Sequence, residues 1–280
     1  MPGDRKVVLV TGGASGIGLG AVHLFAEQGA HVCMVDVSQQ VSEVDKTLAS
    51  EYPQASFSFH KANVADWDQL AEIFEKVYDE QGRIDIVFAN AGISREISFI
   101  LDEEKPSKPQ LPTLEVNLIG VLNTVKLATH YIKKNEIVNE PRGASRGSIV
   151  CTSSIAALYP FPIAPIYAAS KAGVVGLVRS LAAPLEKVAI QINSVAPAFI
   201  ATNLGAGAEN RDSFGKIILT PMSTLTRGLQ QLVSDPSLSG QVAVVHGDSI
   251  TLSPPPQFVD EDTGRDIDIL WSSGVKPAGV

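Results

Sequence analysis

The sequence predicts a single doubly wound α/β domain, and three observations support this fold class. Short β-rich runs alternate with longer segments of helical periodicity, which is typical of strand-helix-strand units. Several of these runs are apolar almost throughout, as expected for strands that helices cover on both faces. The chain has 280 residues, of which 45% are hydrophobic and 19% charged, so it is long enough to bury a sizeable core. Right-handed crossovers between the strands then give a parallel sheet.

The expected strands are rich in apolar and β-branched residues, and they occupy Lys6–Thr11, His31–Val37, Phe57–Lys61, Ile84–Ala89, Gly147–Ser153, Gln191–Ala196 and Gln241–Val245. The expected helices have apolar residues at three- and four-residue spacing, and they occupy Ile17–Gln28, Trp67–Gln81, Leu114–Lys133 and Tyr167–Glu186. Two charged, Pro-containing segments, Leu101–Pro112 and Asn135–Gly147, are expected to be surface loops. From Pro254 the chain is polar and acidic without a helical period, so residues 1–253 are expected to form the domain and residues 254–280 an extended tail.

Composition argues against several classes of partner. The net charge of −8 and the pI near 5.1 disfavour a nucleic-acid-binding surface. The longest apolar stretch, Ile155–Ala169, contains three prolines and is too short to span a bilayer. The two cysteines lie in apolar runs and the five histidines lie in separate elements, so neither a disulfide nor a metal site is expected. The start, MPGDRK, has no cleavable signal, so we expect a cytoplasmic protein with neither nucleic acid nor membrane as a partner.

The segment TGGASGIG at 11–18 follows the first expected strand and opens the first expected helix. A pyrophosphate needs free backbone N–H groups, the positive end of a helix dipole and no side chains where the backbone approaches it. The residues that would form such a cradle are Gly12, Ser15, Gly16, Ile17 and Gly18. The alternative is a Gly-rich turn without a ligand, and the pattern alone does not separate the two. Its place between a strand and a helix favours a dinucleotide-binding turn of the Rossmann type.

Asp36 ends the second expected strand. A carboxylate at that position can accept two hydrogen bonds from a ribose diol and repels a 2′-phosphate. The Gly-rich turn and residues 37–40 contain no Lys or Arg that would attract such a phosphate. NAD is therefore favoured over NADP, and the alternative is an Asp that caps a helix.

Tyr167 and Lys171 are four residues apart in a helical segment, so both side chains project from one face. A tyrosine acts as a base near neutral pH only if its pKa falls by about 3 units from its ordinary value. The Lys171 ammonium and a positively charged nicotinamide ring would both favour the phenolate. Ser153 and Ser154 lie at the C-terminal end of the fifth expected strand, where a hydroxyl could hold a reacting oxygen. Taken singly, these patterns also fit a chance Tyr–Lys pair and a turn at a strand end.

Six short stretches, in this order along the chain, resemble the short-chain dehydrogenase/reductase family over roughly residues 5–250. They are TGGASGIG at 11–18, ANAG at 89–92, Asn117 in EVNLIG, SSIAA at 153–157, YAASK at 167–171 and NSVAPAFIAT at 193–202. The resemblance implies a Rossmann-type parallel sheet with the seven strands in the order 3-2-1-4-5-6-7. The sequence departs from the family pattern at three positions: Ala89 replaces an Asn, and Ala157 and Ala198 replace Gly. None of these changes removes a catalytic side chain.

The resemblance also implies roles for individual residues. Tyr167 would be the general acid/base, Lys171 would lower its pKa and bind the nicotinamide ribose, and Ser154 would hold the substrate oxygen. Asn117 would position a water that links Lys171 to solvent. The implied cofactor contacts also include Asn63 and Val64 at the adenine (Asn63 replaces the usual Asp), Asn90 beside the ribose, Thr202 at the carboxamide with Ile200 behind it, and Pro197.

Within the family, the stretches 165–182 and 232–240 resemble the hydroxyprostaglandin dehydrogenase-like enzymes, which oxidise secondary alcohols with NAD. We therefore expect NAD-dependent oxidation of a hydrophobic secondary alcohol to a ketone, with Tyr167 as the general base. One alternative is ketone reduction by the same residues. Another is a cofactor-binding scaffold, or a helper of a biosynthetic cyclisation, without redox turnover.

The substrate side of the site is expected to be apolar, with residues 203–222 covering it. The apolar candidates are Ala157, Leu158, Phe161, Ile163, Leu204, Phe214, Ile217 and Ile218. Packing of these side chains on a neighbouring helix or subunit is the alternative. The family pairs the equivalents of helices 114–133 and 167–186 between subunits, so the resemblance also implies a homodimer or homotetramer.

Overall fold

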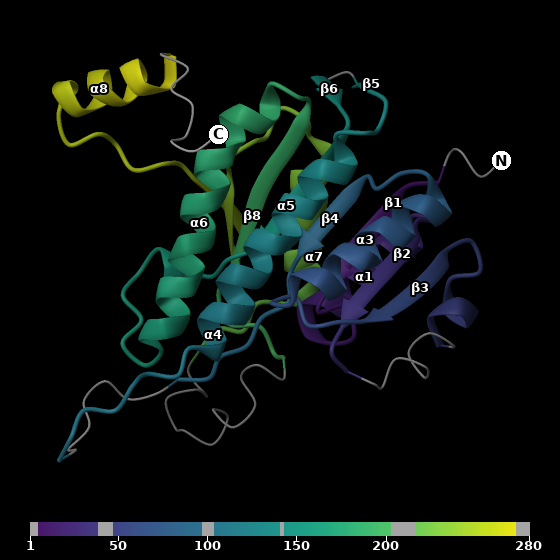
Figure 1. Cartoon of the computed structure of the whole chain (residues 1–280), viewed down its shortest axis with the longest axis horizontal. Coiled ribbons are helices and arrows are strands. Elements are labelled where there is room, and N and C mark those ends of the chain that lie inside the picture. The colour runs from purple at the N-terminus through teal and green to yellow at the C-terminus, as the bar shows by residue number, and fades with distance from the viewer. Residues whose placement is uncertain (1–4, 39–46, 97–103, 141–142, 203–216, 273–280) are drawn as a thin grey trace.

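A computed structural model describes residues 5–38, 47–96, 104–140, 143–202 and 217–272 of the chain. Its central sheet has eight strands in the order β10-β9-β8-β7-β4-β1-β2-β3 (Figure 1). The strands are β1 (Val7–Thr11), β2 (His31–Asp36), β3 (Ser56–Lys61), β4 (Ile86–Ala89), β7 (Gly147–Thr152), β8 (Ile190–Pro197), β9 (Val242–His246) and β10 (Ser249–Ser253). The strands from β3 to β9 are parallel and correspond to the seven predicted ones, so the predicted order 3-2-1-4-5-6-7 is confirmed.

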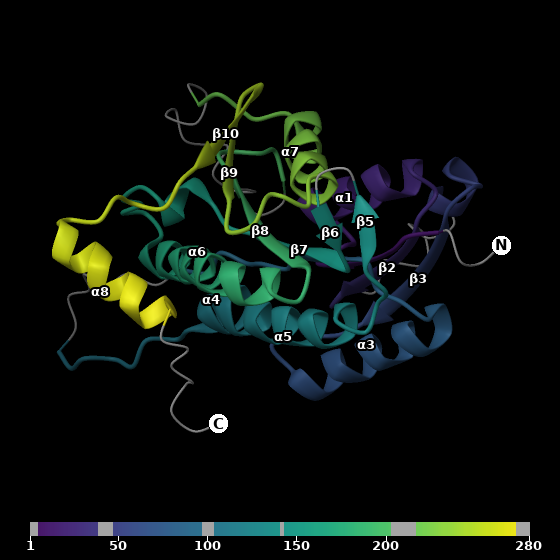
Figure 2. The same cartoon turned by 90° about the horizontal axis from the view of Figure 1, so that it is seen from above.

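Helices cover both faces of the sheet, as predicted (Figure 2). On one face lie α3 (Trp67–Gln81), α5 (Gly120–Ile132) and α6 (Pro165–Glu186), and on the other lie α1 (Gly16–Glu27) and α7 (Met222–Ser234). The chain enters α5 through the short α4 (Pro112–Leu114) and a π-helical turn, η1 (Glu115–Ile119). A 3-10 turn, η2 (Ile155–Ala157), follows β7.

The core is divided by the sheet into two apolar layers, because successive side chains of a strand point to opposite faces. In β1, Leu9 belongs to the layer that contains Phe74 of α3, whereas Val8 and Val10 belong to the layer that contains Phe25 of α1. All five of these side chains are almost completely buried. This packing fixes the carboxyl ends of the parallel strands along one edge.

Three sequence-based expectations are wrong in detail. The sheet has an eighth strand, β10, where seven are expected; it pairs antiparallel with β9 across a tight turn at Gly247 and Asp248. The expected loop at 135–147 contains a hairpin of β5 (Val138–Glu140) and β6 (Gly143–Ser145). The expected extended tail contains a helix, α8 (Glu261–Ser272).

Capping and charge favour the start of α8. The carboxylate of Asp260 accepts a hydrogen bond from the Thr263 backbone N–H at 2.7 Å. Glu261 and Asp262 lie in the first turn, where negative charge is favourable. Figure 1 shows α8 standing away from the sheet, which is why burial periodicity did not predict it.

By length and composition, α6 is apolar enough to cross a membrane. Its side chains Val174 and Val178 are nevertheless fully buried against the sheet, together with Leu185. We therefore describe α6 as a core helix. It also carries two of the predicted site residues, Tyr167 and Lys171.

Replacing Phe74 with Ala should lower the free energy of unfolding by about 3 to 5 kcal/mol, because it leaves a cavity between α3 and the sheet. Phe74 is fully buried and its ring stacks on Tyr131 with centroids 5.9 Å apart. Trp67→Ala, on the same helix but 43% exposed, is the matched control and should cost about 1 kcal/mol or less. Equal losses in urea denaturation of the two variants would contradict this account of the core.

Candidate active site

A cavity of about 770 Å³ lies at the carboxyl edge of the parallel strands. That volume suits a small-molecule site, and the carboxyl edge is where open α/β sheets bind ligands. It is lined by most of the predicted site residues, namely Gly12, Ser15, Gly16, Ile17, Asp36, Asn63, Val64, Asn90, Ser154, Tyr167, Lys171, Pro197, Ile200 and Thr202. Gly18 and Asn117 do not line it.

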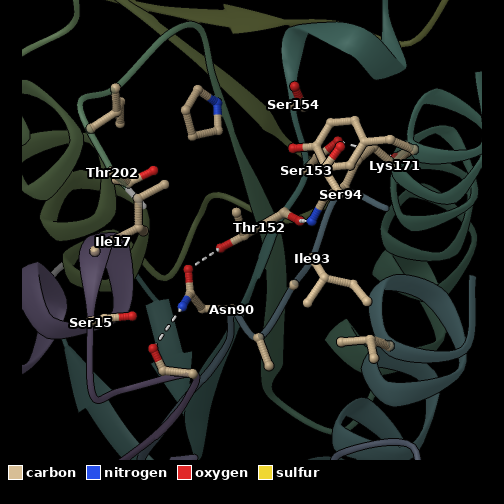
Figure 3. Close-up of a pocket in the computed structure, with 18 of the residues that line it drawn as sticks. Ser15, Ile17, Asn90, Ile93, Ser94, Thr152, Ser153, Ser154, Lys171 and Thr202 are labelled. Atoms are coloured by element: carbon tan, nitrogen blue, oxygen red, sulfur yellow. Dashed lines mark hydrogen bonds between the residues drawn. The ribbon is translucent and has the colours of Figure 1, made fainter. Parts of the chain in front are cut away.

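The Gly-rich turn forms a cradle without side chains. Gly12 has a φ of +66°, and an added Cβ would lie 2.9 Å from the Ala91 Cα. Ser15 is the N-cap residue of α1, and its hydroxyl makes no capping bond. Figure 3 places Ser15 and Ile17 on the same side of the cavity as Thr202. The first-turn N–H groups and the dipole of α1 therefore suit the pyrophosphate of a dinucleotide.

Gly18 has a packing role instead of the predicted cofactor contact. An added Cβ would lie 1.9 Å from the Gly12 carbonyl oxygen and 2.7 Å from the Asn90 amide nitrogen. The missing side chain thus lets the first turn of α1 lie directly against the Gly-rich turn. Gly18 shapes the cradle from behind.

Asp36 ties the cradle to the end of β2. Its carboxylate accepts hydrogen bonds from the backbone N–H groups of Ala14 and Ser38, both at 3.0 Å. Both of these donors lie in loops of the described part of the chain, so neither bond caps a described helix, which was the alternative. A carboxylate has about four acceptor sites, so these two bonds leave capacity for a ribose diol.

Asn90 joins the ends of three adjacent strands at the centre of the site. Its amide donates to the carbonyl oxygens of Thr11 at 3.1 Å and Gly12 at 3.3 Å. Its carbonyl oxygen accepts from the Thr152 hydroxyl at 3.0 Å, as the dashed lines of Figure 3 show. Sequence reasoning missed Thr152, whose signal was its place next to Ser153 at a strand end.

Asn63 and Val64 lie at the end of β3, on the predicted adenine side. The Asn63 side-chain oxygen accepts from the Ala65 N–H at 3.1 Å and so shapes the turn before α3. Val64 packs against Gly120, where an added Cβ would lie 2.4 Å from a Val64 methyl group. Both residues form part of the cavity wall.

Tyr167 and Lys171 lie one turn apart near the start of α6. The Lys171 Nζ is 5.6 Å from the centre of the Tyr167 ring and donates to the Thr152 carbonyl oxygen at 2.8 Å. Ser154, which is buried, faces the same phenol and accepts a hydrogen bond from the Ala156 N–H at 3.1 Å. The predicted Ser–Tyr–Lys set therefore converges on one cavity.

Burial controls the protonation of this set. It raises the pKa of Tyr167 above its ordinary value, while the hydrogen bond with Ser154 acts in the opposite direction. Burial lowers the pKa of Lys171 to about 8. The predicted lowering of the Tyr167 pKa by Lys171 is not found in the chain by itself, because desolvation of the phenol dominates.

Asn117 takes part in the site from outside the cavity. It is completely buried in the π-helical turn η1, a local geometry often found at functional sites. Its side chain accepts a hydrogen bond from the Ile93 N–H and donates to the Ile93 carbonyl oxygen, both at 2.8 Å. It also donates to the Ser170 hydroxyl at 3.2 Å. In the structure, Asn117 holds neighbouring backbone in place.

The apolar wall of the cavity differs in part from the expected one. Phe161 and Ile163 line it, and the ring of Phe161 lies 6.5 Å from that of Phe199, which the sequence analysis missed. Ala157 and Leu158 instead pack on a small cluster behind the wall. Neither Ile217 nor Ile218 lines the cavity. Leu204 and Phe214, with most of the expected covering segment, lie outside the described residues.

Comparisons with known proteins agree with this geometry. A family model described as short chain dehydrogenase matches residues 6–212. The chain is 32% identical over 277 residues to the 15-hydroxyprostaglandin dehydrogenase [NAD(+)] of Rattus norvegicus, covering 92% of this chain and 96% of that protein. The crystal structure of levodione reductase aligns with a TM-score of 0.73 at 27% identity, covering 86% of this chain and 96% of that one. The structure of ElxO with NADP bound aligns equally well, at a TM-score of 0.73 and 29% identity, covering 86% of this chain and 97% of the other.

Replacing Lys171 with Met should reveal the cost of the buried ammonium as a pH-dependent difference in stability. The lowered pKa of Lys171 means that, between about pH 8 and its ordinary value of 10.5, the unfolded chain binds more protons than the folded chain. The contribution of Lys171 to the free energy of unfolding therefore becomes more favourable as the pH rises. The free energy of unfolding of the wild type, relative to Lys171→Met, should increase by about 2 kcal/mol between about pH 7 and about pH 9.5.

The matched control is Lys187→Met, which removes an exposed ammonium at the end of the same helix. Its difference from the wild type should be flat over this pH range in urea denaturation. A flat profile for Lys171→Met as well would show that the Lys171 ammonium is not desolvated in the folded protein.

Proposed function

The chain belongs to the short-chain dehydrogenase/reductase family, and from that premise we propose that it oxidises a hydrophobic secondary alcohol to a ketone with NAD. The family makes it an oxidoreductase that acts on an alcohol or ketone with a nicotinamide cofactor. One observation carries the finer proposal: Ser154, Tyr167 and Lys171 line the same cavity as Asp36 and the Gly-rich turn. Substrate, hydride acceptor and proton acceptor can thus meet in one place.

The reaction removes a proton and a hydride from the substrate. A bound oxidised nicotinamide ring supplies the acceptor for the hydride that leaves the carbinol carbon. The phenolate oxygen of Tyr167 takes the hydroxyl proton and becomes a phenol, and the Ser154 hydroxyl donates a hydrogen bond to the substrate oxygen. Because burial raises the pKa of Tyr167, positive charge beside the phenol has to favour the phenolate. The Lys171 ammonium is the chain's own contribution to that charge.

Asp36 supports NAD over NADP. Its negative charge at the end of β2 opposes a 2′-phosphate on the adenosine ribose. Among the described residues that line the cavity, Lys171 is the one with a basic side chain, and it belongs to the catalytic set. The named relative 15-hydroxyprostaglandin dehydrogenase [NAD(+)] supports the same choice, whereas ElxO has a structure with NADP bound.

An apolar part of the cavity wall supports the proposed substrate class. Phe161, Phe199, Ile155 and Ile163 give that wall an apolar surface. A hydrophobic alcohol or its ketone would bury apolar area there while its oxygen meets Ser154 and Tyr167. Ketone reduction uses the same residues in reverse, and the relative named levodione reductase keeps that direction as the alternative.

We also propose that the protein assembles as a homodimer or homotetramer in the cytoplasm. Ile119 and Leu122, at the start of α5, are 45% and 39% exposed, which supports a subunit contact along this helix. Cys33 and Cys151 are free and buried, as is common in a reducing compartment.

Tyr167→Phe should lower kcat for alcohol oxidation by about 10²- to 10⁴-fold, because it removes the proton acceptor. Turnover is measured as absorbance of reduced nicotinamide with NAD and a panel of hydrophobic secondary alcohols. NADH affinity should change little. Tyr159→Phe, which alters a neighbouring tyrosine that is 63% exposed, should turn over like the wild type. Unchanged turnover in Tyr167→Phe would disprove the mechanism.

Asp36→Asn should raise the ratio of kcat/KM with NADP to kcat/KM with NAD by about tenfold, the effect expected of about 1.4 kcal/mol. Asn keeps an oxygen for the Ala14 or Ser38 N–H but loses the charge that repels a phosphate. Asp79→Asn, exposed on α3, should leave the ratio unchanged. A wild-type preference for NADP would contradict the assignment of NAD.

A further inference from the structure

Residues 91–96, which we call the strap, follow the end of β4 and lie against α4, η1 and the start of α6. The strap forms no helix or strand, and it is held by side chains from other elements. Thr113 of α4 pins Arg95: the Arg95 N–H donates to the Thr113 hydroxyl at 3.0 Å, and that hydroxyl donates to the Arg95 carbonyl oxygen at 2.8 Å. Asn117 pins Ile93 in the same two-way manner.

The last residue of the strap, Glu96, caps α6. Its carboxylate accepts hydrogen bonds from the backbone N–H of Ile166 at 3.1 Å and from that of Tyr167 at 2.8 Å. The N-cap residue of α6 is Ala164, which has no side-chain oxygen to satisfy these first-turn donors. A carboxylate from a distant part of the chain therefore does what a local Ser or Asp does in other helices, and its charge suits the helix dipole.

The backbone of Tyr167 is also held at its carbonyl oxygen. The Ser170 hydroxyl donates to that oxygen at 2.7 Å, and the Ser170 oxygen in turn accepts from the Asn117 amide at 3.2 Å. Since Asn117 is bonded to Ile93, these contacts form a closed ring. The ring runs from the strap through Glu96 to Tyr167, then through Ser170 and Asn117 back to the strap.

We propose that Glu96 is a positioning residue that fixes the backbone of Tyr167, and with it the phenol and Lys171, against the cavity. The inference rests on the proposed dehydrogenase function, because it assigns a role toward the two groups that act there. It extends that function to a strap residue that lies outside the recognised stretches of sequence.

A capping bond acts on the first turn of a helix, and that turn contains Tyr167. The rest of α6 is anchored independently, since Val174 and Val178 are completely buried against the sheet. Loss of Glu96 should therefore loosen the first turn without unfolding the helix. A displacement of about 1 Å can cost a factor of about 10² in rate. The effect belongs in kcat, because the Gly-rich turn that would hold the cofactor is not part of the ring.

The test compares Glu96→Ala with Glu96→Gln, which keeps one acceptor oxygen, and with Glu104→Ala, which removes an exposed carboxylate from the segment after the strap. Two readouts are taken on each full-length variant. The first is amide hydrogen exchange of residues 164–171, with residues 174–186 as the internal reference. The second is kcat, KM for the alcohol and NADH affinity well below the melting temperature.

Glu96→Ala should speed exchange in 164–171 but not in 174–186, and lower kcat by about 10- to 100-fold with NADH affinity within about twofold. Glu96→Gln should recover much of both, and Glu104→Ala should match the wild type. Faster exchange with an unchanged kcat would show that Glu96 caps α6 without affecting turnover, and it would overturn the proposal. So would unchanged exchange, or a Gln variant no better than Ala.

Failure of the proposed function is a separate result. If the wild type oxidises no alcohol and reduces no ketone of the panel, the dehydrogenase assignment falls. The exchange comparison still decides whether Glu96 holds Tyr167, because it needs neither substrate nor cofactor.

Discussion

The site depends on a buried ammonium group. Lys171 is 3% exposed, and an ammonium removed from water is costly unless a polar partner compensates. Its partner is the carbonyl oxygen of Thr152, the last residue of β7. The Ser153 hydroxyl returns a bond to the Lys171 carbonyl oxygen at 3.2 Å. The end of β7 and the second turn of α6 are thus tied in both directions, which fixes where Ser154 and Tyr167 meet.

The sheet supports these two hydrogen bonds because polar contacts also join the ends of its neighbouring strands. Asn90 bonds to the ends of β1 and β7, and Asp36 bonds the Gly-rich turn to β2. The two apolar layers then hold the strands themselves in register. A shift of one strand would break several buried polar contacts at once, and each buried group left without a partner costs about 1 to 3 kcal/mol. The polar contacts at the edge and the apolar core behind them therefore hold the same strands in place.

The sequence was sufficient for features that depend on local pattern. The apolar strands predicted a parallel sheet, and the spacing of Tyr167 and Lys171 predicted that they share a helix face; the structure has both. The helix α8 escaped prediction because its signals are weak: a cap at Asp260 and side chains that are mostly exposed. The resemblance implies a cofactor contact for Gly18 and a water-positioning role for Asn117, whereas the contacts that the structure adds depend on what lies next to these residues in space. Glu96 had no signal, since its partners are 70 and 71 residues away.

The direction of the Tyr167 pKa adds a further constraint. Burial alone makes this phenol a weaker acid, so the folded chain keeps it protonated near neutral pH. Positive charge placed beside the ring opposes that preference by favouring the phenolate. By linkage, the phenolate must in turn bind a cationic ring more tightly than a neutral one. Proton release from Tyr167 and the preference for an oxidised nicotinamide are then described by the same coupling free energy. In the proposed mechanism, the strength of this coupling depends on how closely the phenol is held to the charge, and the contacts that fix the backbone of α6 would set that distance.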